Sequence, residues 1–317
     1  MNKFFIPLVL FTLLLLSSCS PTKSFDQASV REYISAAETQ DIISTLASDE
    51  MKGRDSKNGG YYDAADYVVD YFKAHNIQAF YPKYRDSLVT DSLLSYNIVG
   101  QIGSYDPDRK TVLIGAHLDH IGIRGTEGDT IYNGANDNAS GSTAVLQISS
   151  FLAQHQWEQN IIVALFADEE KGLKGAEHLA QRMKRENVKL EYLVNFEMLG
   201  TALTTGENQV YLTGYEHSNM ADVFNAVSPN FVQFLPEAKE YNLFKRSDNY
   251  PFAETFGVAA QTFATFDFKN YEHYHGAEDE VENLDLENLN KVIGTAAYTL
   301  ARVLQNKTAI VWEKKEE

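Results

Sequence analysis

The spacing of hydrophobic residues changes several times along the chain, and these changes predict alternating strands and helices. Three runs are almost continuously apolar, at residues 111–116 (TVLIGA), 161–166 (IIVALF) and 192–196 (YLVNF). Such runs are typical of strands buried on both faces of a parallel sheet. Between them, residues 143–155 and 173–185 carry apolar side chains at helical spacing. The alternation predicts an α/β fold, with a mostly parallel, mixed central sheet and helices on both faces.

The rest of the chain extends this pattern in both directions without an internal repeat or a low-complexity block. We therefore expect one domain, which covers residues 30–317. Two polar segments with glycine and aspartate, residues 103–109 and 122–132, are expected to be surface loops. The other predicted elements are helices at residues 30–46, 64–72, 218–227 and 285–304, and strands at residues 96–102, 209–213 and 258–263.

The first residues of the chain have the pattern of an export signal. Lys3 precedes an apolar run at residues 4–16, which is short for a membrane span, and LSSC follows at residues 16–19. LSSC resembles the lipobox of bacterial lipoproteins, in which the cysteine is lipidated and becomes the first mature residue. We expect a lipoprotein signal peptide at residues 1–18, a tether at residues 19–29, and an exported protein anchored to a bacterial membrane through Cys19, on its periplasmic or cell-surface face. The alternative is an ordinary signal peptide in which this cysteine is incidental.

Composition narrows the function classes. Cys19 is the only cysteine among 317 residues, so it has no partner for a structural disulfide, and thiolate metal sites are excluded. The formal net charge of -17 would repel phosphate groups, which argues against a nucleic-acid partner. The composition does not predict an oligomeric state.

Acidic residues and histidines follow the predicted strands. In parallel α/β sheets, ligands bind beyond the carboxyl ends of strands, so these side chains are expected to meet. Each motif alone has an ordinary explanation as a turn or a solvated charge, but their coincidence predicts a metal site. The motifs are His117 and Asp119, then Asp137 in the loop NGANDNASG (residues 133–141), then Asp168, Glu169 and Glu170, then Glu197, and finally His273 and His275.

The donors in these motifs are nitrogen and oxygen atoms, which suit a catalytic centre with two metal ions. Two divalent cations ~3.5–4 Å apart repel each other, so a shared carboxylate is needed between them. Asp137 lies between the other clusters in sequence, and it is the natural residue for that position. One glutamate must then stay uncoordinated to accept a proton from water. We expect two zinc ions, although cobalt or manganese would also fit these donors.

Five motifs of the chain closely resemble the co-catalytic di-zinc aminopeptidase family, which includes aminopeptidase Y. They are GAHLDH (residues 115–120), GANDNASG (134–141), EEKGLKG (169–175), NFEMLG (195–200) and YH (274–275). Their order and spacing match the family over roughly residues 46–317. The resemblance implies a zinc-peptidase fold for residues 30–317. It also implies peptide substrates, whose N-terminal residues are removed by water activated between two zinc ions.

The resemblance also implies a role for each matching residue. Asp137 would bridge the ions, one held further by His117 and Glu197 and the other by Glu170 and His275. Glu169 would be the general base. Asp119 would be the carboxylate that receives the other imidazole N–H of His117, which fixes the tautomer of that histidine.

Two positions depart from the family pattern. Glu197 stands where the family usually has aspartate, so its longer side chain could change the geometry or affinity of one metal site. In RSDNYPF (residues 246–252), Asn249 stands where histidine is common. Because this segment borders the substrate cleft in the family, we expect an effect on specificity rather than on chemistry, and we expect Arg246 and Tyr250 to contact substrate.

Other functions on the same scaffold stay open. Glutaminyl cyclases share it with one zinc ion and cyclise N-terminal glutamine, and carboxypeptidase relatives cleave at the other end of a peptide. A third alternative is a non-enzymatic binding lipoprotein, although no ligand or base of the family is missing here. Side-chain specificity and substrate length are not predicted by the sequence.

Overall fold

A computed structural model describes residues 25–313 of the protein. The predicted signal peptide, Cys19 and the residues after Glu313 lie outside this range. The first helix, α1 (Gln27–Tyr33), begins inside the predicted tether, because Asp26 accepts hydrogen bonds from its first turn and Val30 is buried. The folded domain therefore starts a few residues before the expected position.

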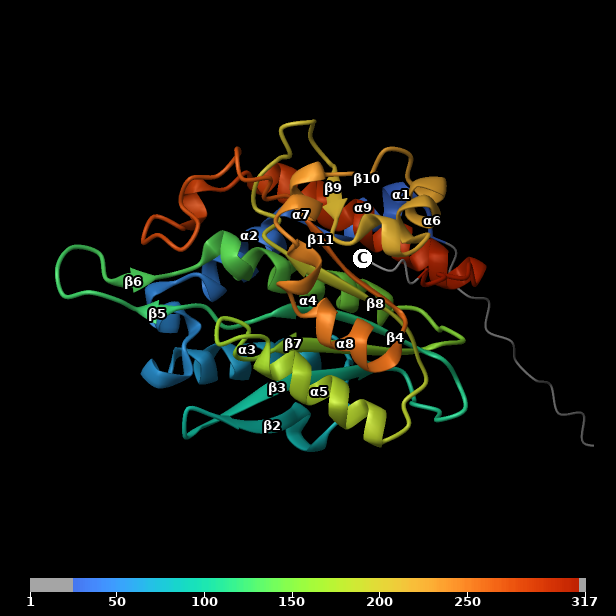
Figure 1. The fold of residues 1–317 in the computed structure, drawn as a ribbon, viewed down its shortest axis with the longest axis horizontal. Coiled ribbons are helices and arrows are strands. Elements are labelled where there is room, and N and C mark those ends of the chain that lie inside the picture. The colour runs from blue at the N-terminus through green and yellow to red at the C-terminus, as the bar shows by residue number, and fades with distance from the viewer. Residues whose placement is uncertain (1–24, 314–317) are drawn as a thin grey trace, which may run out of the picture.

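A nine-stranded mixed sheet forms the centre of the molecule and is covered by helices on both faces (Figure 1). The strands are β1 (Gln78–Ala79), β2 (Arg85–Thr90), β3 (Leu93–Ile102), β4 (Thr111–His117), β7 (Asn160–Phe166), β8 (Leu190–Glu197), β9 (Val210–Leu212), β10 (Val232–Gln233) and β11 (Ala259–Ala264), with a separate hairpin of β5 (Gly122–Ile123) and β6 (Ile131–Tyr132). Besides α1, the α-helices are α2 (Ala36–Leu46), α3 (Gly60–Ala74), α4 (Gly141–Leu152), α5 (Lys174–Arg185), α6 (Met220–Val227), α7 (Pro236–Glu240), α8 (Asn249–Phe256) and α9 (Leu286–Asn306).

The four central strands, β7, β4, β8 and β11, are parallel to one another. The chain leaves β4 through α4 to reach β7 on one side, then passes through α5 to β8 on the other side of β4. Strand order thus reverses at β4, and such switch points open a crevice at the carboxyl ends of the strands. The predicted α/β fold with its mixed sheet is confirmed.

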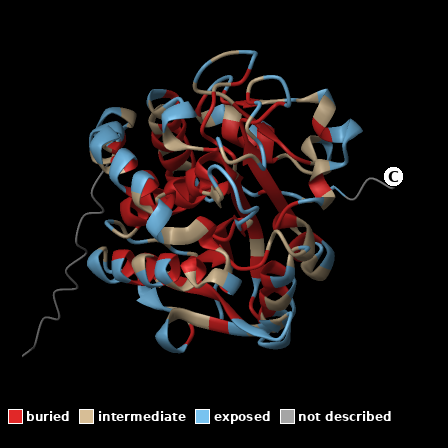
Figure 2. Cartoon of the chain, turned by 90° about the vertical axis from the view of Figure 1, so that its left-hand side faces the viewer, coloured by how far each residue is buried: buried red, intermediate tan, exposed pale blue. Residues whose placement is uncertain are grey.

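Residues alternate between the two faces of β4. Val112, Ile114 and Ala116 join the core under α3, α4 and α9, whereas Leu113 joins the core under α5 and α8. Every residue of α4 is buried, as expected for a helix enclosed between the sheet and other helices. Figure 2 shows this buried interior, with exposed residues on the outer turns of the helices, in loops and on the edge strands of the sheet.

The segment predicted as one helix at residues 30–46 is two helices. The chain breaks at Ile34 and Ser35, where the Ser35 hydroxyl accepts the N–H of Glu38 and caps α2. Helical spacing alone did not reveal this break, because Ile34 is as buried as the residues that follow it. The predicted surface loop at residues 122–132 contains the β5–β6 hairpin, which projects from the body (Figure 1).

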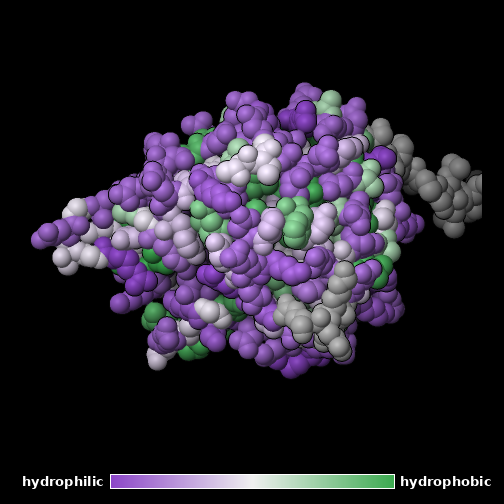
Figure 3. All heavy atoms as spheres, turned by 45° about the horizontal axis from the view of Figure 1, so that its top comes forward, coloured by the Kyte–Doolittle hydropathy of each residue, from purple (hydrophilic) through white to green (hydrophobic). Residues whose placement is uncertain are grey.

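Hydrophilic residues predominate on the face in Figure 3, where apolar residues form scattered patches. None of the helices within residues 25–313 is both long enough and apolar enough to cross a membrane.

Candidate active site

Asp137 lies between two of the predicted histidine ligands. Its Oδ1 is 3.3 Å from Nε2 of His117, which ends β4, and its Oδ2 is 3.1 Å from Nε2 of His275. The histidines lower the pKa of Asp137, although burial alone would raise it. The sequence suggested an exposed turn residue, but Asp137 is only 3% exposed. The two carboxylate oxygens face different histidines, as a bridging ligand requires.

Glu170 joins this group together with a residue that was not predicted, His120. The Oε1 atom of Glu170 is 3.2 Å from Nε2 of His275 and 3.1 Å from Nδ1 of His120. One ligand atom from each of His120, Asp137, Glu170 and His275 lies within 4.8 Å of the other three. His120 satisfies the criterion that identified His117, because it follows the same strand, so the sequence did contain a signal for it.

Glu169 differs from Glu170 in having no partner for its carboxylate among residues 25–313. Burial raises its pKa well above the usual value, and the carboxylates of Glu197 and Asp248 add to this effect. Glu197 ends β8 and is partly buried, and its Oε2 is enclosed without a hydrogen-bond partner in the described part of the chain. The carboxylates of Glu169 and Glu197 both lie close enough to His117 to interact electrostatically with it.

The loop that carries Asp137 (Ala135–Ser140) turns tightly and is not a regular helix, because the backbones of Asp137 and Asn138 lie outside the helical region. The side chains on either side of Asp137 hold the segment after β8: Asn138 accepts the N–H of Met198 and donates to the carbonyl of Phe196, and Asn136 accepts the N–H of Gly200. Because alternate residues are anchored there, Asp137 is left to point at the histidines. Asn136 and Asn138 thus hold the loop at residues 133–141 against the segment that follows β8.

Gly134 and Asp279 also fix the position of this loop. A β-carbon on Gly134 would lie 2.5 Å from the His120 ring, so only glycine allows this approach. The carboxylate of Asp279 accepts the backbone N–H groups of Asn136 and Asp137 and the hydroxyl of Tyr271, at 2.7, 3.1 and 2.6 Å. Asp279 therefore ties the loop of His275 to that of Asp137. The sequence did not distinguish it from neighbouring acids.

Asp119 lies beside His117, but its contact differs from the expected one. The backbone carbonyl of Asp119 is 3.1 Å from Nδ1 of His117, whereas its carboxylate is 4.0 Å away. The carboxylate instead accepts the backbone N–H groups of Glu169 and Glu170. Burial raises the pKa of Asp119 to about 7. The predicted carboxylate contact is corrected to a carbonyl contact, because two amide donors engage the side chain.

Four residues in or beside these turns have left-handed backbones, which are uncommon outside glycine. They are Arg54, Asp168, Met198 and His275, with φ of 48°, 53°, 50° and 55°. Such conformations are retained where contacts with surrounding residues offset their energetic cost, and they concentrate at functional sites. The support is visible at Asp168, whose carboxylate pairs with Lys171 at 2.9 Å.

Arg54 is completely buried behind the site, and its guanidinium binds backbone carbonyls rather than an acid. It donates to the carbonyls of Leu118, Leu46, Asn133 and Gly134 at 2.5 to 2.8 Å, with a longer contact to Asp137 at 3.4 Å. Burial lowers its pKa to about 10. One side chain thus joins α2, the turn after β4 and the loop of Asp137.

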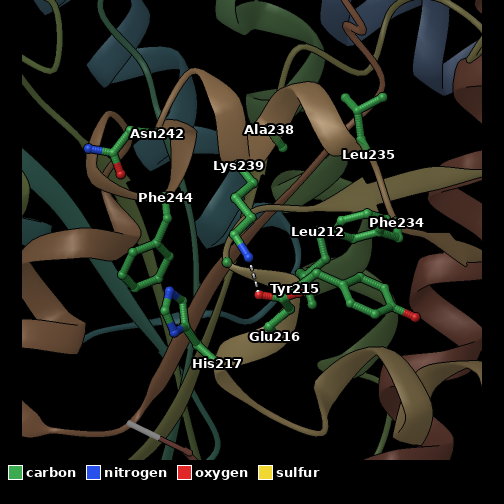
Figure 4. A pocket seen from close by; sticks show the side chains of 11 residues that line it. Leu212, Tyr215, Glu216, His217, Phe234, Leu235, Ala238, Lys239, Asn242 and Phe244 are labelled. Carbon is green, nitrogen blue, oxygen red and sulfur yellow. Dashed lines mark hydrogen bonds and ion pairs between the residues drawn. The ribbon is translucent and has the colours of Figure 1, made fainter. Parts of the chain in front are cut away.

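A cavity of about 70 Å³ lies beside Glu197, and Arg246, Phe266 and Tyr274 are among its lining residues. Tyr250 does not line it, because its ring packs against Phe244. A larger cavity of about 410 Å³ lies among Tyr215, Phe234 and Lys239, and none of the predicted site residues lines it (Figure 4).

Asn249 is buried within the fold rather than in the cleft. Its side chain donates to the carbonyls of Phe244 and Ala260 and accepts the hydroxyl of Thr262. These contacts are structural, and the expected effect of Asn249 on specificity stays a prediction.

The charge of the site fits a requirement for cations. Asp119, Asp137, Asp248 and the three glutamates surround only three histidines, and both oxygens of the fully buried Asp248 lack hydrogen-bond partners within residues 25–313. Asp137 and Glu170 raise the pKa of His275 to about 10 by hydrogen bonding, so they attract positive charge. Buried carboxylates at this density are stabilised by metal ions, and the nitrogen and oxygen donors suit zinc.

Comparisons with known proteins agree with this arrangement. Residues 97–300, more than half of the chain, match peptidase family M28. A probable zinc metalloprotease of Pyrenophora teres f. teres is 35% identical over 101 residues, which cover 32% of this chain and 20% of that protein. The chain thus matches only about a fifth of this relative's length.

Two solved structures share the fold. The LapA aminopeptidase of Legionella pneumophila has a TM-score of 0.71 at 16% identity, over 96% of this chain and 80% of LapA. The glutaminyl cyclase of Porphyromonas gingivalis has a TM-score of 0.64 at 16% identity, over 84% of this chain and 98% of the cyclase. At these identities, the comparison concerns architecture alone.

Proposed function

The chain belongs to peptidase family M28, and on that basis we propose that it is a zinc-dependent aminopeptidase that removes N-terminal residues from peptides. The observation that carries the proposal is the position of Asp137, whose two oxygens face His117 and His275 on opposite sides. An uncoordinated carboxylate, Glu169, lies beside this group. This combination supports the proposal, because it would offer both a place for two cations and a proton acceptor.

The residues divide into two ligand groups that share Asp137. His117 and Glu197 would hold one zinc ion, and Glu170 and His275 would hold the other; cobalt or manganese would suit the same donors. Zinc bound there would lower the pKa of a water molecule toward neutrality. Glu169 would be the group that accepts a proton from the attacking water and donates one to the leaving amine, because no other side chain of the described residues occupies its carboxylate. Arg246, exposed at the rim of the cavity beside Glu197, is positioned to contact the peptide.

The glutaminyl cyclase comparison provides a rival function, since this chain covers 98% of that protein but 80% of LapA, which is described as an aminopeptidase. The ligand set favours hydrolysis, because a single-zinc cyclase would leave His117 and Glu197 without a metal to bind. The two reactions differ in their products. Hydrolysis releases a free amino acid, whereas cyclisation of N-terminal glutamine releases ammonia.

A kinetic screen with aminoacyl amides and glutaminyl peptides, each with and without a zinc chelator, tests this proposal. We expect hydrolysis of at least one aminoacyl amide, its loss with the chelator, and its return when zinc is added back. Ammonia release from glutaminyl peptides without amino-acid release would favour the cyclase. Zinc-loaded protein that is inactive on the whole panel would contradict both reactions and leave the binding-protein alternative.

We also propose that Cys19 carries a lipid that anchors the protein to a bacterial membrane. The support is the LSSC motif after an apolar run and the absence of any other cysteine in the sequence. We expect the protein expressed in a bacterial host to sediment with membranes and the Cys19→Ala variant to leave the membrane fraction. A Ser20→Ala variant, which keeps the cysteine, should stay with the membranes. Membrane association of Cys19→Ala equal to that of the unchanged protein would contradict lipidation.

A further inference from the structure

His120 has no role in the ligand set proposed above, although it is buried at the centre of the site. Its side chain is enclosed between Gly134 and Glu170, and its ring centroid is 5.7 Å from that of His275. The ring presents Nδ1 to Glu170 Oε1 at 3.1 Å and to Asp137 Oδ2 at 3.9 Å. The same nitrogen of His120 therefore faces two of the carboxylates that are proposed to bind metal.

Three of the distances within this group are close to those of a single coordination shell, and the fourth, from His120 Nδ1 to Asp137 Oδ2, is longer at 3.9 Å. Donor atoms around a tetrahedral zinc ion at ordinary bond lengths lie about 3.3 Å apart. The measured separations are 3.1 Å and 3.2 Å from His275 Nε2 to Asp137 and Glu170, and 3.1 Å and 3.9 Å from His120 Nδ1 to Glu170 and Asp137. All four atoms lie within 4.8 Å of one another. Two imidazoles and two carboxylates therefore converge on one point.

From this convergence we propose that His120 is a fourth protein ligand of the metal ion held by Glu170 and His275. The inference rests on the proposed zinc site, and it makes the two halves of that site unequal. Four protein donors close the coordination of a tetrahedral zinc ion, as in structural zinc sites, whereas three leave a position open for water or substrate. The open position then belongs to the ion held by His117 and Glu197, and Glu169 interacts electrostatically with that side through His117.

A simpler role for His120 would be to donate a hydrogen bond from Nδ1 to Glu170 and so orient a ligand without touching the metal. The 3.1 Å distance alone allows this role. It does not account for the approach of the same nitrogen to Asp137 or for its place in the four-atom group. The two roles also predict different losses of metal affinity, because partners outside the coordination shell typically contribute 10–100-fold.

The test compares zinc affinities of His120→Ala, His120→Asn and the unchanged protein in chelator-buffered zinc, with metal content measured by mass spectrometry. Asparagine places an amide near the position of Nδ1, so it keeps a donor for Glu170 but removes the imidazole. We expect both variants to bind one of the two ions more than about 100-fold more weakly and to keep the other. His178→Ala, on α5 and paired with Asp86 at 3.3 Å rather than with the site, is the control and should leave both affinities unchanged. Asp137→Ala should lose both ions.

Normal zinc binding by His120→Asn with weak binding by His120→Ala would overturn the inference in favour of the hydrogen-bond role. Unchanged binding by both variants would overturn it outright. Circular dichroism of the metal-free proteins checks folding, and the visible absorption of bound cobalt provides a second measurement, since loss of a ligand changes the absorption of four-coordinate cobalt. Unchanged protein that binds a single ion would contradict the two-ion function, and the same variants would then test His120 on that ion.

Discussion

Glu169→Gln is expected to lower kcat by about 10²–10⁴-fold while the protein retains all of its zinc. The amide has nearly the shape of the carboxylate but cannot accept a proton from water. Metal binding should survive because Glu169 lies outside the four-atom group formed by Glu170 and its neighbours. The measurement is kcat on the best aminoacyl amide of the screen, together with zinc content by mass spectrometry.

Two glutamates provide matched controls for this experiment. Glu170→Gln should lose zinc as well as activity, because Glu170 Oε1 faces both His120 and His275. Glu177→Gln, in the first turn of α5 and exposed, should change neither property. Full activity of Glu169→Gln, or loss of its zinc, would show that Glu169 is not the general base.

Arg54→Met is expected to lower the free energy of unfolding by about 3 kcal/mol or more. Methionine fills part of the volume but leaves the carbonyls of Leu46, Leu118 and Asn133 without the donors that Arg54 provides, whereas the carbonyl of Gly134 keeps the N–H of Ala139. Each buried, unpaired carbonyl carries a desolvation penalty of about 1–3 kcal/mol. Urea unfolding, followed by circular dichroism on metal-free protein, measures the change without any contribution from zinc.

An exposed arginine provides the comparison for Arg54. Arg109 pairs with Asp106 at 3.2 Å, with both side chains at least 42% exposed, so Arg109→Met should change stability by less than about 1 kcal/mol. If both variants unfolded at the same urea concentration, the buried hydrogen bonds of Arg54 would contribute no more to the free energy of unfolding than the exposed ion pair of Arg109. Arg54→Lys should recover only part of the loss, since one ammonium cannot reach carbonyls that lie on several sides.

The fold was largely predictable because its central strands are buried on both faces. Runs such as residues 161–166 are apolar throughout, and their order with the intervening helices is enough to predict a parallel centre. The break between α1 and α2 was not predictable from spacing, since Ile34 continues the buried stripe while Ser35 ends it. The boundary is set by the cap at Ser35, and the spacing of apolar residues does not reveal it.

The site was predictable where residues follow strands and unpredictable where they act through space. His117, Glu170 and Glu197 could be placed from topology, because the carboxyl ends of parallel strands meet. Asp279 and Arg54 are distant in sequence, and their role depends on which backbone groups they meet. Contacts between a side chain and a backbone amide or carbonyl far away in the sequence do not produce a repeating pattern of residue types, so spacing cannot predict them.

If Cys19 carries the proposed lipid, the position of α1 also limits the distance between the folded domain and a membrane. The N-cap at Asp26 leaves six residues, 20–25, between Cys19 and this cap, and a fully extended chain from Cys19 to Asp26 spans at most about 25 Å. That reach is shorter than the thickness of the bilayer with its headgroups, which is ~40–45 Å. With Cys19 lipidated, the domain would therefore remain at the lipid headgroups and meet peptides that pass close to the membrane surface.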